Sequence, residues 1–333
     1  MAFGLCVVGC GDYTKIVMDD FLDLPEKIDL YFASRDLQKS KEYAKKYKAA
    51  GYFGDYETAA RDTRVNAMYF LTPHDVHLEN VKLAARYRKD VLLEKPIART
   101  LIEGNQILKI IQDANIKCMI AENFQFMPVN LAAKKIVQSG RLGKIRQVDI
   151  YCVIRSHFQE WTWRNDIKRC GGGRFIDGGI HYVNLLINLM GLPSTVFALS
   201  AISSIPNFEG EDSLTLLCKN NDGVIGSIHY SNASPVSGTR QHVSVRGTQA
   251  ELSFKTGSSS LVISELEAKE NVELLVGGRG TRETINEFLE CVISDKDIEM
   301  TCEKGLYDLS VVMAAYDSNT TSKEVSVPKI TVL

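Results

Sequence analysis

Apolar segments with strand character alternate with amphipathic segments with helix character in the N-terminal part of the chain. The apolar segments are residues 3–8, 28–33, 67–71, 91–93 and 117–121, and the stretches between them include "DLQKSKEYAKKYK" and "HDVHLENVKLAARYR". This alternation predicts an α/β fold, a doubly wound parallel sheet with right-handed crossovers and helices on both faces. In such a sheet, ligands bind beyond the carboxyl ends of the strands. The pattern therefore predicts where to look for a site.

The pattern changes after residue 127. One amphipathic helix, "NLAAKKIVQSG", and a Gly-rich helix are followed by strands that succeed one another directly. "DSLTLLCKNNDGVIGSIHYS" is a predicted hairpin, and "RQHVSVRGTQAELSF" and "SSSLVISE" continue the alternation. Two final stretches, "TRETINEFLECVIS" and "EKGLYDLSVVMAAYDS", have helical periodicity. Since 333 residues are many for one core, we expect two domains, 1–122 and 123–333, the second an α+β domain with a largely antiparallel sheet.

Composition favours a protein that works on small molecules. Lys+Arg 39 against Asp+Glu 41 give a net charge of -2, which offers no field to attract nucleic acid or an anionic membrane. The eight cysteines include no CxxC pair, so we expect reduced core residues and no metal site. The N-terminus lacks a basic segment before its apolar run, and no apolar run is long enough to span a membrane. We therefore expect a cytoplasmic protein.

"VVGCGDYTK" places two glycines between the first strand and the first helix. Gly9 and Gly11 there allow a tight turn and a close approach of the backbone to a pyrophosphate, which the helix N-terminus stabilises. Asp12 and Tyr13 begin that helix. Thr14 stands at the third position of the motif, where Gly or Ala is usual, and we expect it to loosen the helix packing. The stretch predicts dinucleotide binding.

The second strand ends in "YFASRD", where a ribose-binding acid is expected. Ser34 and Arg35 stand there instead, and a hydroxyl with a guanidinium suits a 2′-phosphate that a carboxylate would repel. The alternative is a solvated loop in which Asp36 binds the ribose. We expect NADP(H) to be preferred and NAD(H) to be possible.

"VLLEKPIART" ends a buried strand at two opposite charges. Pro96 cannot donate a ladder hydrogen bond, so the strand stops there and presents Glu94 and Lys95 at its carboxyl end. In isolation, this is also the pattern of an ordinary charged turn. "FLTPHDVHLENV" follows another strand with Thr72, Pro73 and His77, and we expect these to line the cofactor cleft. "AENFQFMP" places Glu122, Asn123 and Gln125 beyond the last parallel strand.

"WTWRNDIKRCGGGRFIDGGIHYVNLLINLMG" concentrates polar groups and glycines. Residues 171–173 suit a turn through which a ligand or the backbone passes closely. Asp177 and His181 are four residues apart, so a helix would present them on one face, and Asn184 extends that face. Three leucines, Leu185, Leu186 and Leu189, would anchor the helix in the core. The alternative for a lone histidine on a helix is a structural role.

These motifs together resemble the Gfo/Idh/MocA family of nicotinamide-dependent oxidoreductases. The resemblance covers essentially the whole chain, including "RGTQAELSF" and the last helical stretch. It implies an N-terminal Rossmann domain and a C-terminal domain whose large open sheet often forms a dimer or tetramer interface. It also implies that Lys95, Asp177 and His181 match catalytic positions and that Trp163 and Arg164 match a pair that contacts the cofactor. Asn184 and Gln125 depart from the family's usual Asp and "RF".

We therefore expect reversible oxidation of a secondary alcohol on a sugar or polyol, with His181 as the base, Lys95 stabilising the oxygen and Asp177 holding a neighbouring hydroxyl. Two alternatives are a glycoside hydrolase that uses NAD transiently and a non-catalytic dinucleotide-binding regulator. The expected substrate contacts are Lys95, Asp177, His181 and Asn184. The expected cofactor contacts are Gly9, Gly11, Asp12, Tyr13, Ser34, Arg35, Thr72, Pro73, His77, Glu94, Lys95, Asn123, Trp163 and Arg164.

Overall fold

A computed structural model describes residues 2–21, 28–155, 162–201, 203–205 and 207–330. These residues form two compact units. The first comprises Met1–Glu122 and Thr281–Leu306, and the second comprises Asn123–Gly280 and Tyr307–Thr331. Part of the loop "SHFQEWTWRNDIKRC", residues 156–161, lies outside the described residues.

The first unit contains a parallel sheet of six strands, as expected. The order is β3-β2-β1-β4-β5-β6, with bounds β1 (Phe3–Val8), β2 (Ile28–Ala33), β3 (Gly51–Phe53), β4 (Ala67–Phe70), β5 (Asp90–Glu94) and β6 (Cys118–Ala121). Apolar side chains bury these strands on both faces, which is why their sequences are continuous apolar runs. The chain moves outward from β1 to β3 and then returns to β4 on the other side of β1, so the switch point of the topology lies between β1 and β4.

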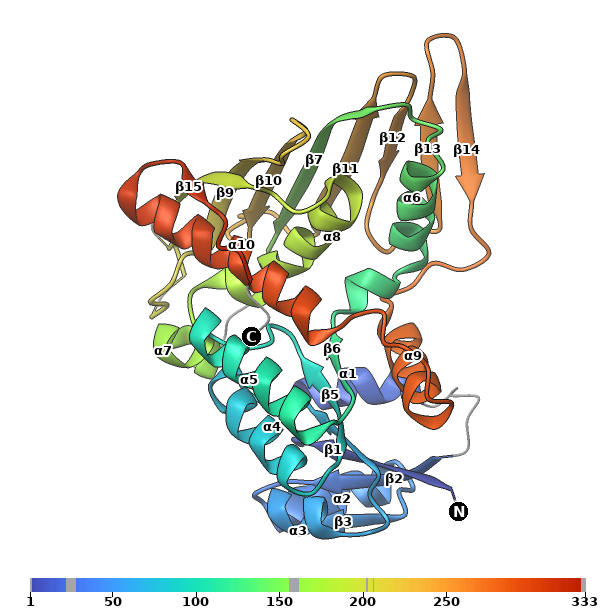
Figure 1. Cartoon of the computed structure of the whole chain (residues 1–333), viewed down its shortest axis with the longest axis vertical. Helices are drawn as coiled ribbons and strands as arrows, with labels where there is room; N and C mark the ends of the chain where they lie inside the picture. Colours follow the sequence, from blue (N-terminus) through green and yellow to red (C-terminus); the bar gives the residue numbers. More distant parts are fainter. Residues whose placement is uncertain (1, 22–27, 156–161, 202, 206, 331–333) are drawn as a thin grey trace. The chain divides into compact units, whose positions relative to one another are not determined.

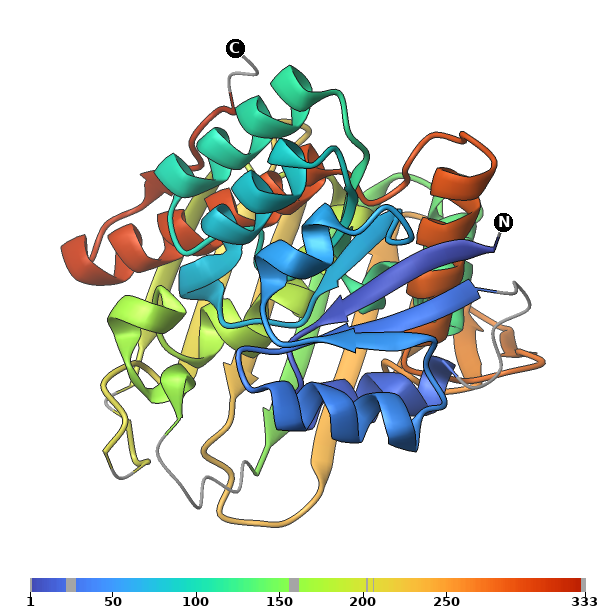
Figure 2. The ribbon, with the colours of Figure 1, turned by 90° about the horizontal axis from the view of Figure 1, so that it is seen from below.

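Helices cover both faces of this sheet (Figure 2). They are α1 (Asp12–Phe21), α2 (Leu37–Lys46), α3 (Tyr56–Arg61), the short η1 (His74–Val76), α4 (His77–Arg86), α5 (Leu101–Ala114) and α9 (Thr281–Ile293). Helix α9 contacts α1 and β6. The segment from Thr281 to Leu306 therefore packs with the N-terminal unit, although it follows the strands of the second unit and the expected boundary at residue 122 had grouped it with them.

The second unit is built on an open sheet of nine strands that is mostly antiparallel, as expected. The order is β14-β13-β12-β11-β7-β10-β9-β8-β15, and only the pair β7–β10 among the described pairs is parallel. The bounds are β7 (Ile145–Ile154), β8 (Thr195–Ser200), β9 (Ser213–Lys219), β10 (Ile225–Ser231), β11 (Thr239–Gly247), β12 (Glu251–Phe254), β13 (Ser260–Ser264), β14 (Lys269–Glu273) and β15 (Val325–Ser326). The predicted hairpin is β9–β10.

Helices α6, α8 and α10 lie along one face of this sheet (Figure 1). The helical segments are η2 (Asn123–Phe126), α6 (Pro128–Gln138), η3 (Trp163–Asn165), α7 (Ile167–Cys170), the π-helical turn η4 (Phe175–Gly179), α8 (Ile180–Met190) and α10 (Cys302–Thr321). The three leucines expected to anchor α8, Leu185, Leu186 and Leu189, are all buried.

The eight cysteines are reduced, seven of them buried and Cys10 half-buried. Burial raises the pKa of the Cys10 thiol to about 12, so this thiol stays protonated at neutral pH. No helix in the described ranges combines the length and the apolar character that crossing a membrane requires.

Candidate active site

The glycine turn after β1 contains two glycines with different constraints. Gly9 has a φ of +107°, and a Cβ there would collide with the carbonyl oxygen of Leu71. Gly11 has no other heavy atom within 4 Å of the position of a Cβ. The protein's own packing therefore requires glycine at position 9, whereas position 11 borders open space at the N-terminus of α1.

The expected loosening of helix packing at Thr14 is not found. Thr14 is buried, and its hydroxyl donates a hydrogen bond to the carbonyl oxygen of Gly9 at 2.7 Å. The hydroxyl of Tyr43 in α2 donates to the carbonyl oxygen of Gly11 at 2.9 Å. The turn is thus held from both sides. Asp12 is exposed in the first turn of α1 and pairs with Lys15 at 2.7 Å, and Tyr13 beside it is half-buried.

At the end of β2, the two candidate ribose contacts have different surroundings. The Asp36 carboxylate caps α2 by accepting hydrogen bonds from the backbone N–H groups of Gln38 and Lys39, at 3.0 and 3.2 Å. Ser34 is buried, and its hydroxyl oxygen accepts from the backbone N–H of Asp36 at 3.1 Å. Arg35 is exposed. The carboxylate is therefore engaged with its own helix, while the exposed Arg35 side chain interacts with the side chain of Tyr56.

Thr72 and Pro73 follow β4, next to β1 in the sheet. The Thr72 hydroxyl accepts a hydrogen bond from the Asn80 side chain at 2.7 Å. His77 is fully buried, with its ring nitrogens 3.0 Å from the carbonyl oxygen of Pro96 and 3.1 Å from that of Thr72. Burial lowers the pKa of His77, so the neutral ring donates to one of these carbonyls. This geometry favours a bracing role between the ends of β4 and β5 over direct contact with a cofactor.

Lys95 follows β5 and is half-buried, and the Lys95–Pro96 peptide bond is cis. Glu94 before it is buried and accepts a hydrogen bond from the Tyr69 hydroxyl at 2.7 Å. Burial raises the pKa of Glu94 to about 7, although the Lys95 charge and the Tyr69 hydroxyl oppose the shift. Glu122, at the end of the neighbouring β6, is buried too. The end of β5 therefore carries an ammonium group beside buried carboxyl groups.

In the second unit, the structure brings Asp177 together with two arginines. The Arg164 side chain donates from Nε to the Asp177 carboxylate at 3.2 Å, and Arg174 does so from Nη1 at 3.2 Å. The Arg164 guanidinium also lies over the Trp163 ring, 4.4 Å from its centroid. Asp177 and the expected cofactor pair thus form one cluster.

The expected spacing along one regular helix was wrong. Asp177 lies in the π-helical turn η4, and α8 begins only at Ile180. A π-helical turn changes the angular relation between residues four apart, and such turns are frequent at functional sites. The i, i+4 pattern alone therefore does not define the relation between Asp177 and His181.

Arg174 was not predicted as a site residue. Its side chain is 4% exposed, against 36% for Arg164, and its guanidinium lies 4.6 Å from the centroid of the Phe208 ring. Burial lowers the pKa of Arg174, but a guanidinium stays charged in proteins. The available signal was a charge inside the apolar stretch "GGGRFIDGG".

The glycines of 171–173 are explained by contacts within the protein. Gly171 ends α7 with a φ of +92°. A Cβ on Gly172 would lie 2.5 Å from the Tyr316 hydroxyl, and one on Gly173 would collide with Glu211. The Tyr316 hydroxyl also accepts from the backbone N–H of Ile176 at 3.0 Å and donates to the Glu211 carboxylate at 2.9 Å. Of the two expected readings, close passage of backbone and side chain accounts for this turn.

His181 and Asn184 have different environments on α8. His181 is half-buried, and its ring stacks on that of Phe124. Asn184 is buried and donates from Nδ2 to the Asp308 carboxylate in α10 at 2.9 Å. This favours a structural role for Asn184. Asn123 donates from Nδ2 to the carbonyl oxygen of Arg279 at 2.5 Å.

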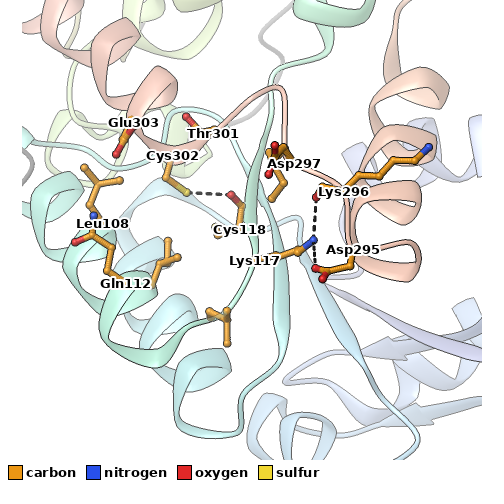
Figure 3. Close-up of a pocket in the computed structure, with 13 residues that line it drawn as sticks. Leu108, Gln112, Lys117, Cys118, Asp295, Lys296, Asp297, Thr301, Cys302 and Glu303 are labelled. Carbon is orange, nitrogen blue, oxygen red and sulfur yellow. Dashed lines mark hydrogen bonds and ion pairs between the residues drawn. The ribbon is translucent and has the colours of Figure 1, made fainter.

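The first unit also contains a cavity of about 490 Å³, which is lined by none of the predicted site residues (Figure 3). It is lined by Lys117 and Cys118 at the amino end of β6, by the last turns of α5, and by residues 295–298 and 301–303. The Lys117 ammonium donates to the carbonyl oxygens of Cys291 and Lys296, each at 2.8 Å, and pairs with Asp295. Since it opens at the amino ends of the strands, this cavity is not at the edge where parallel sheets bind ligands.

Comparisons with known proteins agree with the fold. A model of the oxidoreductase family with an NAD-binding Rossmann fold matches residues 3–122, and a model of the GFO/IDH/MocA C-terminal domain matches residues 130–253. The mouse (Mus musculus) trans-1,2-dihydrobenzene-1,2-diol dehydrogenase is 29% identical over 62% of this chain and 63% of its own length.

Two solved structures have the same fold over nearly the full chain. Levoglucosan dehydrogenase in complex with NADH and levoglucosan superposes with a TM-score of 0.89 at 18% identity, covering 99% of this chain and 100% of that one. The aldose-aldose oxidoreductase of Caulobacter crescentus, complexed with glycerol, superposes with a TM-score of 0.87 at 24% identity, covering 98% of this chain and 100% of that one.

Proposed function

Because the chain belongs to the Gfo/Idh/MocA family of oxidoreductases, we propose that it interconverts a secondary alcohol and a ketone on a sugar, polyol or related small molecule by hydride transfer. The observation that carries this proposal is the placement of the glycine turn, Thr72 and Lys95 at the carboxyl ends of β1, β4 and β5, three neighbouring strands of one parallel sheet. The relatives named above act on a cyclic diol and on levoglucosan by their names, which supports this substrate class.

The residues at this edge fit a nicotinamide dinucleotide. The open space at Gly11 lies at the N-terminus of a ten-residue helix, where backbone N–H groups and the helix dipole favour a pyrophosphate. When bound, the cofactor supplies the carbon that accepts or donates the hydride. The first unit, mainly residues 1–122, would hold most of the cofactor, and the second unit would contribute to the substrate site and form the oligomer.

His181 and Lys95 divide the work on the reacting oxygen. Oxidation of an alcohol requires removal of the hydroxyl proton, and the His181 imidazole would take it up and return it in the reverse reaction. The Lys95 ammonium would donate a hydrogen bond to the same oxygen and stabilise the negative charge that develops there.

Asp177 would act as a hydrogen-bond acceptor and not as a base. Two guanidinium groups contact its carboxylate, and positive neighbours favour the ionised form. Arg174 is buried and would stay with Asp177, whereas the more exposed Arg164 could turn towards the cofactor. The retained charge lets Asp177 hold a second hydroxyl of the substrate.

The two glycines of the first turn give a matched pair of variants. Gly9→Ala should lower the free energy of unfolding by about 1–3 kcal/mol, because a Cβ there collides with backbone. Gly11→Ala should leave stability unchanged and weaken NADP(H) binding, because only the ligand would occupy that space. Thermal unfolding and cofactor titration of both variants test this. Undiminished cofactor affinity in Gly11→Ala would remove the pyrophosphate assignment.

The preference for NADP(H) is also a proposal. Its support is the exposed Arg35 next to the hydroxyl of Ser34, together with the use of the Asp36 carboxylate as the cap of α2. Lys39 in the first turn of α2 adds a further positive charge close to Asp12 and Cys10. An adenosine 2′-phosphate carries the complementary charge.

We propose self-association through the open sheet. Cross-strand neighbours form one row over five strands: His242, Tyr151, His229, Thr215 and Leu199. Tyr151, in the central strand β7, is 42% exposed, and Leu199, in β8 next to the edge strand β15, is 55% exposed, which is high for large apolar side chains on a sheet. A face of this kind is typical of an interface.

Light scattering should therefore give at least twice the chain mass of 37.1 kDa at micromolar concentration. The double variant Tyr151→Glu/Leu199→Glu should shift the mass towards the monomer, because paired charges would have to be desolvated at the interface. Leu266→Glu, at the fully exposed tip between β13 and β14, is the control and should leave the mass of the oligomer unchanged. A monomeric wild type would contradict the proposal.

The proposed function as a whole is tested by a substrate screen. Levoglucosan, trans-1,2-dihydrobenzene-1,2-diol, inositol and simple aldoses would be offered with NADP⁺ and NAD⁺, and absorbance of the reduced nicotinamide would be followed. Net cofactor reduction supports the dehydrogenase. Cleavage of a glycoside without net cofactor change would favour a hydrolase instead.

A further inference from the structure

Phe124 forms a parallel aromatic stack with His181. The ring centroids are 4.6 Å apart and the ring planes are inclined by 15°. Phe124 lies in η2, in the loop that follows β6, and His181 lies in the first turn of α8. Aromatic rings at this separation attract one another by dispersion and by their quadrupoles. The contact therefore restrains the plane of the imidazole.

The Phe124 ring also packs against a second aromatic ring, that of Tyr182. The Tyr182 ring meets it edge to face, with centroids 5.2 Å apart and an interplanar angle of 81°. Tyr182 is buried, and its hydroxyl accepts a hydrogen bond from Nε2 of Gln241 in β11 at 2.6 Å. A support therefore runs from the central part of the sheet through Tyr182 and Phe124 to His181.

The η2 turn is also held by hydrogen bonds to two helices. The Gln125 side chain accepts a hydrogen bond from Asn188 of α8 at 2.7 Å. The carbonyl oxygen of Phe124 accepts one from Asn130 of α6 at 3.0 Å. Because η2 is tied to both helices, the Phe124 ring cannot simply follow a rotating imidazole.

We propose that Phe124 is a positioning residue that fixes the orientation of the His181 ring for proton transfer. The χ2 torsion of histidine has a broad energy profile, so a half-buried imidazole has little intrinsic preference for one ring plane. A flat, anchored ring stacked on its face removes that freedom. The inference rests on the proposed function, in which His181 is the base.

The kinetic test compares three variants on whichever alcohol of the panel above gives the highest kcat/KM. Phe124→Leu should lower kcat about ten-fold, because it removes the stacking surface and misplaces the base. The dissociation constant of NADP(H) should not change. Phe124→Tyr, which keeps the ring, should retain most of kcat. Phe126→Leu, a matched change at a buried position of the same turn, should affect stability more than kcat.

A spectroscopic test does not depend on activity. With ¹³C-labelled histidine, the ring signals of His181, identified from His181→Asn, should carry a ring-current shift from Phe124. This shift should vanish in Phe124→Leu and persist in Phe126→Leu.

The outcomes distinguish a failure of the Phe124 positioning role from a failure of His181 as the base. A Phe124→Leu enzyme with wild-type kcat, equal losses in Phe124→Leu and Phe126→Leu, or a Phe124→Tyr enzyme as slow as Phe124→Leu would each overturn the inference. If Phe124→Leu does not fold, the Tyr variant and the wild-type ring-current shift decide. Normal turnover in His181→Ala would instead overturn the proposed base, while the stack itself would still be measured by the shift.

Discussion

His181→Ala and Lys95→Ala should each lower kcat by about 100- to 10,000-fold, the range that a positioned proton-transfer group contributes. The reason is that both groups would act on one oxygen, the first by taking its proton and the second by stabilising its charge. Affinity for NADP(H) should survive in His181→Ala. Stopped-flow and steady-state kinetics with the best alcohol of the panel, alongside cofactor titration, measure the two effects separately.

A matched control is available for Lys95. Lys109→Ala removes an exposed ammonium on α5. It should not change kcat by more than about two-fold, as surface substitutions rarely have large effects. If His181→Ala turns over at nearly the wild-type rate, His181 is not the base. A normal Lys95→Ala enzyme would remove the electrostatic role of Lys95.

Arg35→Ala should weaken NADP(H) about ten- to hundred-fold and leave NAD(H) little changed. A charge-assisted hydrogen bond is worth roughly 1.5–3 kcal/mol, and only NADP(H) carries the 2′-phosphate that would receive it. Ser34→Asp should go further and invert the preference, because its carboxylate would repel the phosphate and accept hydrogen bonds from the ribose hydroxyls. Fluorescence titration of each variant with both cofactors gives the four affinities.

Arg86→Ala, at an exposed position in the last turn of α4, is the control for a general loss of positive charge. This variant should change neither the affinity for NADP(H) nor the affinity for NAD(H). Equal losses for the two cofactors in Arg35→Ala would mean that Arg35 contacts a part they share. A wild type that prefers NAD(H) would also defeat the argument.

Much of the fold was predictable because the signals are local. Strand and helix periodicity in the first unit, and the alternation in the β9–β10 hairpin, reflect burial that each segment shows in its own sequence. The same holds for Leu185, Leu186 and Leu189, whose spacing marks the buried face of α8. Gly9 was predictable since a tight turn between strand and helix demands it.

The details of the candidate site depend on contacts between distant parts of the chain. The sequence shows three glycines but not that Glu211 and Tyr316 close around them. It shows Arg174 three residues before Asp177, a spacing at which helical side chains can pair, but not that the Arg174 side chain is buried against the Phe208 ring. The return of α9 to the N-terminal sheet is equally invisible, since an amphipathic pattern does not say which surface it will cover.

The fastening of η4 by Tyr316 has a consequence for biosynthesis. The backbone N–H of Ile176 donates a hydrogen bond to the Tyr316 hydroxyl, which lies 140 residues further along the chain. During translation, η4 and its neighbouring glycines are therefore synthesised long before Tyr316. Contacts between residues so far apart in sequence form late. We expect nascent chains that end before Tyr316 to leave this loop open to proteases, and the hydrogen bond between Ile176 and Tyr316 to form only after α10 has left the ribosome.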